Sequence, residues 1–166
     1  MAFRIGADLE TAFMHVNNQL AATLADDRFI TAFIGLLDPQ AHRVRFLSGG
    51  QGPILHFRAA SGTCERHKPT SFPLAAMPLA KTRPAVTIEM EPGDILVLLS
   101  DGIYEYRNGY GEEFGSARVE KLLKSHHDRP MVRLSAILFD WIRAFAEKSP
   151  QEDDMTVVFV KRLRGA

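Results

Sequence analysis

A nearly continuous apolar run, Ile95–Ser100, constrains the fold of this chain more than any other segment. A strand that is apolar at position after position needs cover on both faces, so it belongs in the interior of a sheet. The run stops at Asp101, and a second largely apolar run, Met155–Val160, directly follows Asp153 and Asp154. The sequence therefore predicts two buried strands, each with acidic residues at one end.

The other segments predict further strands and helices. Apolar residues at helical spacing predict a first helix from Leu9 to Leu24, with Asp8 as its N-cap. The proline-rich stretch 59–84 is predicted to be a loop with short extended pieces, because proline interrupts regular structure. Two later helices are predicted over Ala117–Ser125 and from Pro130 onward, and further strands over Phe29–Leu37, Val44–Leu47, Pro53–Phe57 and Ala85–Met90.

Strands thus come in runs with helices grouped beside them, which indicates an α+β fold with a mainly antiparallel sheet. The length of 166 residues and the 46% hydrophobic content are those of one globular domain spanning 1–166, and they exclude a disordered chain. Twenty basic and 20 acidic residues give zero net charge, which argues against nucleic acid or an acidic membrane as the main partner. The apolar runs are too short to span a membrane and Met1–Ile5 has no secretory pattern, so the expected location is the cytoplasm.

The acidic residues at the strand ends are the strongest candidate for a functional site. If the two strands are antiparallel neighbours, Asp101 lies beside Asp153 and Asp154 at one rim of the sheet. Clustered carboxylates repel one another unless a proton or a cation lies between them, and their hard oxygens suit Mg²⁺ or Mn²⁺. Gly102 would add a carbonyl or allow a close approach of the backbone. The alternative is that all four are ordinary turn residues.

Other residues carry weaker signals. The chain has one cysteine, Cys64, so it forms no internal disulfide, and the arginine of the Cys-x₅-Arg phosphatase motif is replaced by Thr70. The six histidines show no metal-protease spacing. None of these residues is predicted to form a site.

The order of motifs along the chain is more specific than any one of them. Pro92-Gly93-Asp94 is followed by Asp101-Gly102-Ile103-Tyr104-Glu105, then by Gly111-Glu112-Glu113-Phe114-Gly115, and finally by Asp153-Asp154-Met155-Thr156. This order strongly resembles the SpoIIE-like branch of the PPM family, the metal-dependent protein serine/threonine phosphatases. The resemblance runs from about Leu9 to Arg162.

The resemblance implies two packed antiparallel sheets flanked by helices, with two Mn²⁺ or Mg²⁺ ions at one rim. It also implies that metal-activated water, and no protein nucleophile, attacks the phosphorus of a phosphoserine or phosphothreonine. Asp101 and Asp153 match the family's metal-binding aspartates, and Asp154 takes the place beside Asp153 where other members often have Asn. The aspartates found from strand pattern are therefore those that the family implies.

Two departures from the family pattern bear on activity. An earlier Asp-x-Ser-Gly-His-Gly motif, whose aspartate and glycine bridge the metals in the family, does not occur in this sequence. Gln51 stands where the branch usually has histidine. The sequence is therefore expected to be an N-terminally truncated version of the fold. Three explanations stay open: a piece of a longer regulator, a degenerate phosphatase, or a sheet completed by a partner chain, such as a homo-oligomer.

Two functions follow as hypotheses. The first is a phosphatase output domain of a bacterial signalling regulator, which would act on a phosphorylated anti-sigma-factor antagonist. The second is a catalytically inactive phosphatase-like module that binds a phosphoprotein without turnover.

Overall fold

A computed structural model describes residues 8–25 and 27–165 of the chain. The segment Met1–Ile5, on which the expectation about secretion rests, lies outside the described residues. Contacts divide the chain into two compact units, and each is described by itself. The prediction of a single domain over 1–166 stays a prediction. The first unit comprises Met1–Gly52 and Lys68–Met90, and the second comprises Pro53–His67 and Glu91–Ala166.

The first unit is a three-stranded antiparallel sheet with one helix. Its strand order is β1-β2-β5, where β1 is Ala32–Asp38, β2 is Arg43–Gly49 and β5 is Val86–Glu89. Helix α1 (Leu9–Thr23) begins at Asp8, whose side chain accepts a 2.7 Å hydrogen bond from the backbone N–H of Thr11, as the sequence predicts. The core of this unit is formed by Leu9, Phe13, Leu47 and Leu74.

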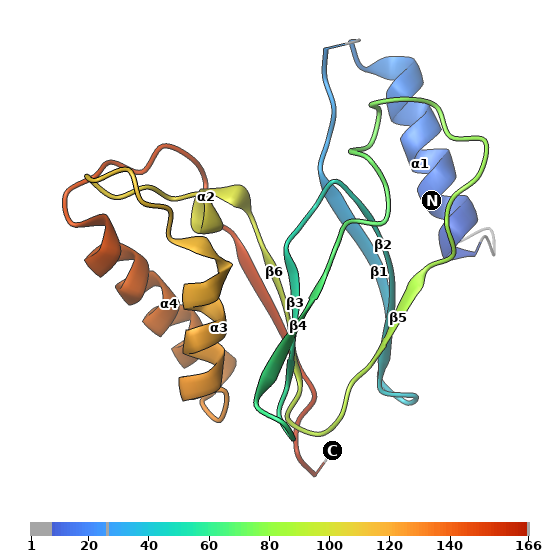
Figure 1. Ribbon diagram of the computed structural model, residues 1–166. Coiled ribbons are helices and arrows are strands. Elements are labelled where there is room, and N and C mark those ends of the chain that lie inside the picture. The colour runs from blue at the N-terminus through green and yellow to red at the C-terminus, as the bar shows by residue number, and fades with distance from the viewer. Residues whose placement is uncertain (1–7, 26, 166) are drawn as a thin grey trace. The chain divides into compact units, whose positions relative to one another are not determined.

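The second unit is a four-stranded antiparallel sheet of order β4-β3-β6-β7. Helices α3 and α4 lie beside each other against this sheet (Figure 1). Apolar side chains of the strands and of these helices, including Phe57, Val97, Leu122 and Leu138, form its buried core. The elements are β3 (Ile54–Arg58), β4 (Thr63–His67), β6 (Ile95–Leu99), α2 (Asp101–Tyr104), α3 (Gly115–His126), α4 (Met131–Ala146) and β7 (Val157–Lys161).

The predicted α+β class with antiparallel sheets and flanking helices is confirmed. The sequence did not locate two elements. Strand β4 lies within the stretch 59–84 that was predicted to be a loop with short extended pieces, but its bounds and pairing were not predicted; it is an edge strand with the polar sequence Thr-Cys-Glu-Arg-His, so it lacks the alternation that marks a half-buried strand. Helix α2 has only four residues, too few for a helical period. No helix among the described residues is long and apolar enough to cross a membrane.

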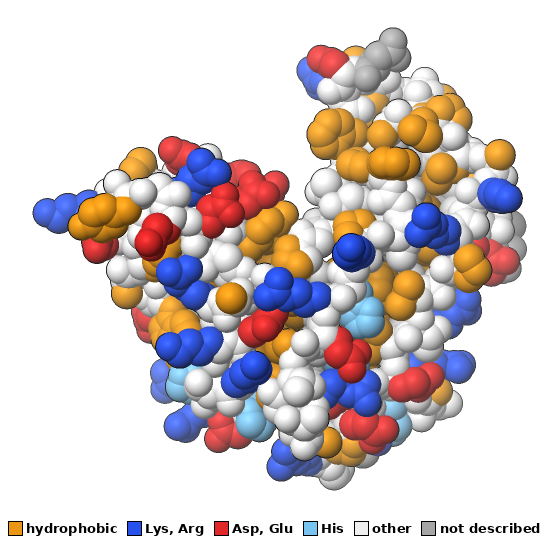
Figure 2. Space-filling view, viewed as in Figure 1, with side chains coloured by type: hydrophobic (Ala, Val, Ile, Leu, Met, Phe, Trp, Pro, Cys, Tyr) orange, Lys and Arg blue, Asp and Glu red, His pale blue; other side chains and the backbone are white. Residues whose placement is uncertain are grey.

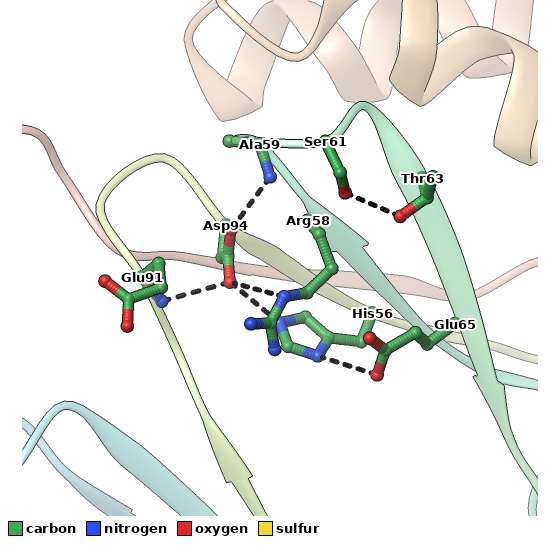
Figure 3. A network of polar contacts seen from close by, with 8 residues as sticks. All are labelled: His56, Arg58, Ala59, Ser61, Thr63, Glu65, Glu91 and Asp94. Carbon is green, nitrogen blue, oxygen red and sulfur yellow. Dashed lines mark hydrogen bonds and ion pairs between the residues drawn. The ribbon is translucent and has the colours of Figure 1, made fainter.

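A buried carboxylate, Asp94, fixes the start of β6. The side chain is fully buried and accepts hydrogen bonds from the backbone N–H groups of Ala59 (2.8 Å) and Glu91 (3.0 Å). It also contacts Nε2 of His56 at 3.1 Å and Nε of Arg58 at 3.7 Å (Figure 3). A buried charge with several donors is stable, whereas loss of the charge leaves those donors unsatisfied.

We therefore expect Asp94→Ala to lower the free energy of unfolding by about 3–5 kcal/mol. The control is Asp140→Ala, which removes an exposed carboxylate that forms an ion pair with Arg143 on the same helix and should change stability by less than about 1 kcal/mol. Chemical denaturation of both variants measures the difference. Equal unfolding midpoints for the two variants would contradict the role assigned to Asp94.

Candidate metal centre

The end of β6 and the start of β7 are joined side by side, as the sequence predicts. The two strands are antiparallel, with Leu99 opposite Val157. Beyond this pair, the N–H of Ser100 donates to the carbonyl of Thr156 (2.9 Å), and the N–H of Thr156 donates to Oγ of Ser100 (2.8 Å). Oγ of Ser100 in turn donates to the carbonyl of Asp154 (2.9 Å). Ser100, the residue before Asp101, is therefore hydrogen-bonded to the segment that precedes β7.

This junction forms one wall of an acidic pocket of about 290 Å³. Asp101, Gly102 and Asp153 line it, so the structure brings three of the four predicted residues together. In Figure 2, acidic side chains gather on the surface over the place where Figure 1 shows α2. The other lining residues are Glu105, Tyr106, Arg107, Pro150 and Glu152.

Position 102 has no room for a side chain, so glycine is required there. A Cβ at this position would clash with the carbonyl oxygen of Asp154 and would lie 2.9 Å from its carbonyl carbon and 3.2 Å from that of Asp153. The backbone of α2 therefore packs directly on the Asp153–Asp154 segment. This close approach holds Asp101 and Asp153 on one wall of the pocket.

Each of the two aspartates keeps one oxygen available. One Oδ of Asp101 accepts from the N–H of Gly102 (3.1 Å), and one Oδ of Asp153 accepts from the N–H of Asp154 (2.7 Å). The second oxygen of each accepts no hydrogen bond from the described residues. Asp154 differs, since it acts through its carbonyl and does not line the pocket.

The donor set fits a hard divalent ion. Exposed carboxylate oxygens with no sulfur or imidazole among the lining residues suit Mg²⁺ or Mn²⁺. Mg²⁺ is commonly held by one or two carboxylates and keeps several waters, so two aspartates are a sufficient minimum. Within the described chain, however, the pocket does not bring three acidic ligand atoms within 4.8 Å of one another.

Three charged residues of the pocket were not predicted from the sequence: Glu105, Glu152 and Arg107. Glu105 ends one quoted motif and Glu152 directly precedes another, but their patterns gave no reason to single them out. Arg107 donates to Glu113 at 2.8 Å, and this bond, together with the negative charges of Glu113, Glu105 and Glu152, raises the pKa of Arg107. Arg107 is therefore a fixed cation at an otherwise acidic pocket, suited to an anionic substrate group.

Cys64 is held in the thiol form by its surroundings. It lies on β4 with its side chain partly buried against the core of the second unit. Burial, with a contribution from the charge of Glu120, raises the pKa of the Cys64 thiol to about 11. Because the thiolate is the reactive form, this result supports the sequence-based exclusion of a cysteine-dependent phosphatase.

Solved structures with the same fold are phosphatase domains. The SiaA-PP2C domain of Pseudomonas aeruginosa matches with a TM-score of 0.77 at 17% identity, covering 96% of this chain and 62% of that one. The phosphatase domain of SpoIIE from Bacillus subtilis, presoaked with Mn, matches with a TM-score of 0.67 at 22% identity, covering 97% and 68%. The fold is that of a PP2C-type phosphatase domain.

Comparison of the sequence with known proteins identifies the family. The family model for stage II sporulation protein E (SpoIIE) matches residues 1–163, so the chain belongs to the SpoIIE family. Protein IcfG of Synechocystis sp. (strain ATCC 27184 / PCC 6803 / Kazusa) is 26% identical over 151 residues. That match covers 90% of this chain and 23% of IcfG, so the chain spans about a quarter of this relative's length.

We expect Gly102→Ala to lower the free energy of unfolding by about 1–3 kcal/mol, because the added methyl group must displace the Asp153–Asp154 backbone. Gly109→Ala is a matched control: its added Cβ would have Ser149 Oγ at 3.7 Å, an ordinary contact. Thermal and chemical denaturation measure both. A Gly102→Ala variant as stable as Gly109→Ala would contradict the close packing of α2 on this segment.

Proposed function

We propose that this chain is a metal-dependent phosphatase domain that hydrolyses phosphoserine or phosphothreonine in a phosphoprotein. One observation supports the proposal most strongly. The antiparallel pairing of β6 and β7 brings Asp101 and Asp153 to one pocket in a chain of the SpoIIE family. Two sequence-distant carboxylates with available oxygens are what such chemistry requires of the protein.

In this proposal Asp101 and Asp153 hold Mn²⁺ or Mg²⁺ through the oxygens that accept no hydrogen bond from the described residues. Gly102 contributes by its close packing, and Asp154 by the carbonyl that positions Ser100. When bound, the divalent ions supply charge neutralisation at the phosphoryl oxygens and an acidified water, with two ions expected in a complete domain. Arg107 is placed to orient the anionic phosphoryl group.

The proposed substrate is a phosphorylated anti-sigma-factor antagonist, and the proposed context is the output domain of a bacterial signalling regulator in the cytoplasm. The support is membership of the SpoIIE family, whose Bacillus subtilis member is a cell fate determinant with a phosphatase domain. A protein substrate also suits the open, polar pocket, since the pocket lies at the surface with its carboxylates exposed.

The alternative function is a phosphatase-like module that binds a phosphoprotein without turnover. The observation that favours it is that the described residues at the pocket do not gather three acidic ligand atoms within 4.8 Å. A homo-oligomer is proposed independently of this pocket. Strand β1 is an outer strand of the sheet of the first unit and exposes Leu36 (42%) and Leu37 (57%), so a second copy of the chain is a proposed partner at that edge.

The test is Mn²⁺-dependent hydrolysis of p-nitrophenyl phosphate and of a phosphoserine peptide. We expect Asp101→Asn and Asp153→Asn each to lower the rate at limiting Mn²⁺ by at least about tenfold, since each removes a charged ligand. Asp140→Asn, an exposed carboxylate on α4, should match the wild type.

Equal rates in the wild type and Asp101→Asn would refute the enzymatic proposal. Phosphopeptide binding without hydrolysis, measured by calorimetry at saturating Mn²⁺, would establish the alternative.

A further inference from the structure

A second group of ligand-type side chains lies on the β3–β4 hairpin. His56 on β3 pairs directly with Glu65 on β4, and His67 lies two residues further along the same strand. Because side chains two apart in a strand point to the same face, Glu65 and His67 share a face of the hairpin with His56. Among the described residues, these three are the only His, Cys, Asp or Glu group whose ligand atoms all lie within 4.8 Å of one another.

His56 is oriented as a ligand. Its ring lies between two carboxylates, with Nε2 3.1 Å from Asp94 and Nδ1 3.9 Å from Glu65 (Figure 3). If Nε2 carries the hydrogen that Asp94 accepts, the lone pair of Nδ1 points toward the Glu65 carboxylate. Two acceptors then face each other at 3.9 Å, an arrangement that a cation between them stabilises.

The burial of both histidines is consistent with a metal ion as that cation. Burial is the largest cause lowering the pKa of His56, against the opposing effect of Asp94, and burial likewise lowers the pKa of His67. Both rings are therefore held toward the neutral form, which is the form that binds metal.

The support of His56 by Asp94 is typical of metal sites. A histidine that binds a metal almost always donates its other ring N–H to a carboxylate or carbonyl group, which fixes its tautomer and orientation. Asp94 is fully buried and held by two backbone N–H groups, so it is a rigid partner for this purpose. Asp94 contacts Nε2 of His56, and Nδ1 of the same ring faces Glu65, which is the order of groups that a metal-binding histidine requires.

We propose that His56, Glu65 and His67 form a binding site for Zn²⁺, separate from the acidic pocket at Asp101 and Asp153. Two imidazoles and a carboxylate form a known three-ligand zinc set with water as the fourth ligand. Zn–ligand bonds of about 2.1 Å place ligand atoms of a tetrahedral site roughly 3.4 Å apart, so modest side-chain rotation closes the present separations.

A metal ion bound at this site would stabilise the pairing of the edge strand β4 with β3. Strand β4 has only β3 as a neighbour in its sheet, and a bound ion would add a cross-link between them. Imidazole ligands favour Zn²⁺ over Mg²⁺, whereas the acidic pocket has only oxygen donors. The two sites therefore differ in the ions that they select.

The test is titration of chelator-treated full chain with Zn²⁺ against a competing chromophoric chelator, and separately with Co²⁺ as a spectroscopic probe. We expect one Zn²⁺ per chain at this site and a visible Co²⁺ absorption of tetrahedral intensity. Glu65→Gln and His67→Gln should each weaken Zn²⁺ binding by at least about tenfold, since each removes one of three protein ligands. Both variants alter residues that are not fully buried, so the fold should be retained, as circular dichroism would show.

The matched controls are His15→Gln on α1 and Glu89→Gln on β5, both exposed, which should bind Zn²⁺ as the wild type does. Asp101→Asn with Asp153→Asn should also leave this binding unchanged, which separates the proposal from the phosphatase site. Absence of stoichiometric Zn²⁺ binding, or equal affinity in the wild type, Glu65→Gln and His67→Gln, would overturn the proposal.

Discussion

The antiparallel pairing of β6 with β7 is the constraint on which the candidate site depends. The pairing sets which residue after β6 lies beside which residue before β7, and a shift of one residue would turn every side chain to the opposite face. Ser100 extends the connection past the last strand pair, and the small size of Gly102 allows the two backbones to touch. Asp101 and Asp153 lie on one pocket wall because of these contacts.

Strand β6 has an aspartate just before it and another just after it, in opposite environments. Asp94, directly before the strand, is fully buried and surrounded by donors, so its charge is used within the fold. Asp101, which follows the strand after Ser100, is exposed and has an oxygen that no described donor reaches. The same type of side chain therefore has a structural role before the strand, at Asp94, and is available to a cation after it, at Asp101.

The sequence predicted the parts of this arrangement that depend on strand pattern. The long apolar run of β6 and the acidic residues beside both strands indicated two buried neighbouring strands with a shared rim. The antiparallel pairing of β6 with β7 is confirmed. The predicted burial of the second strand is wrong, because β7 is an outer strand of its sheet and none of its residues is fully buried. It could not predict β4, because an edge strand with polar residues has no periodic signal, nor α2, because four residues do not complete a pattern. Glu105, Glu152 and Arg107 reach the pocket only through the tertiary fold. The histidine cluster was missed for the same reason, since Glu65 and His67, in the stretch predicted as a loop with short extended pieces, meet His56 of the predicted strand Pro53–Phe57 only across the hairpin.

The central claim is that a divalent ion binds at Asp101 and Asp153, and the most direct test locates the ion on the protein. Paramagnetic Mn²⁺ broadens the NMR signals of nearby amides, so substoichiometric Mn²⁺ can be added to ¹⁵N-labelled chain. The account predicts that the amides of Gly102 and Asp154 broaden first, and that Asp153→Asn removes this selectivity. Broadening that is uniform, or that is centred elsewhere while Gly102 and Asp154 stay sharp, would contradict it.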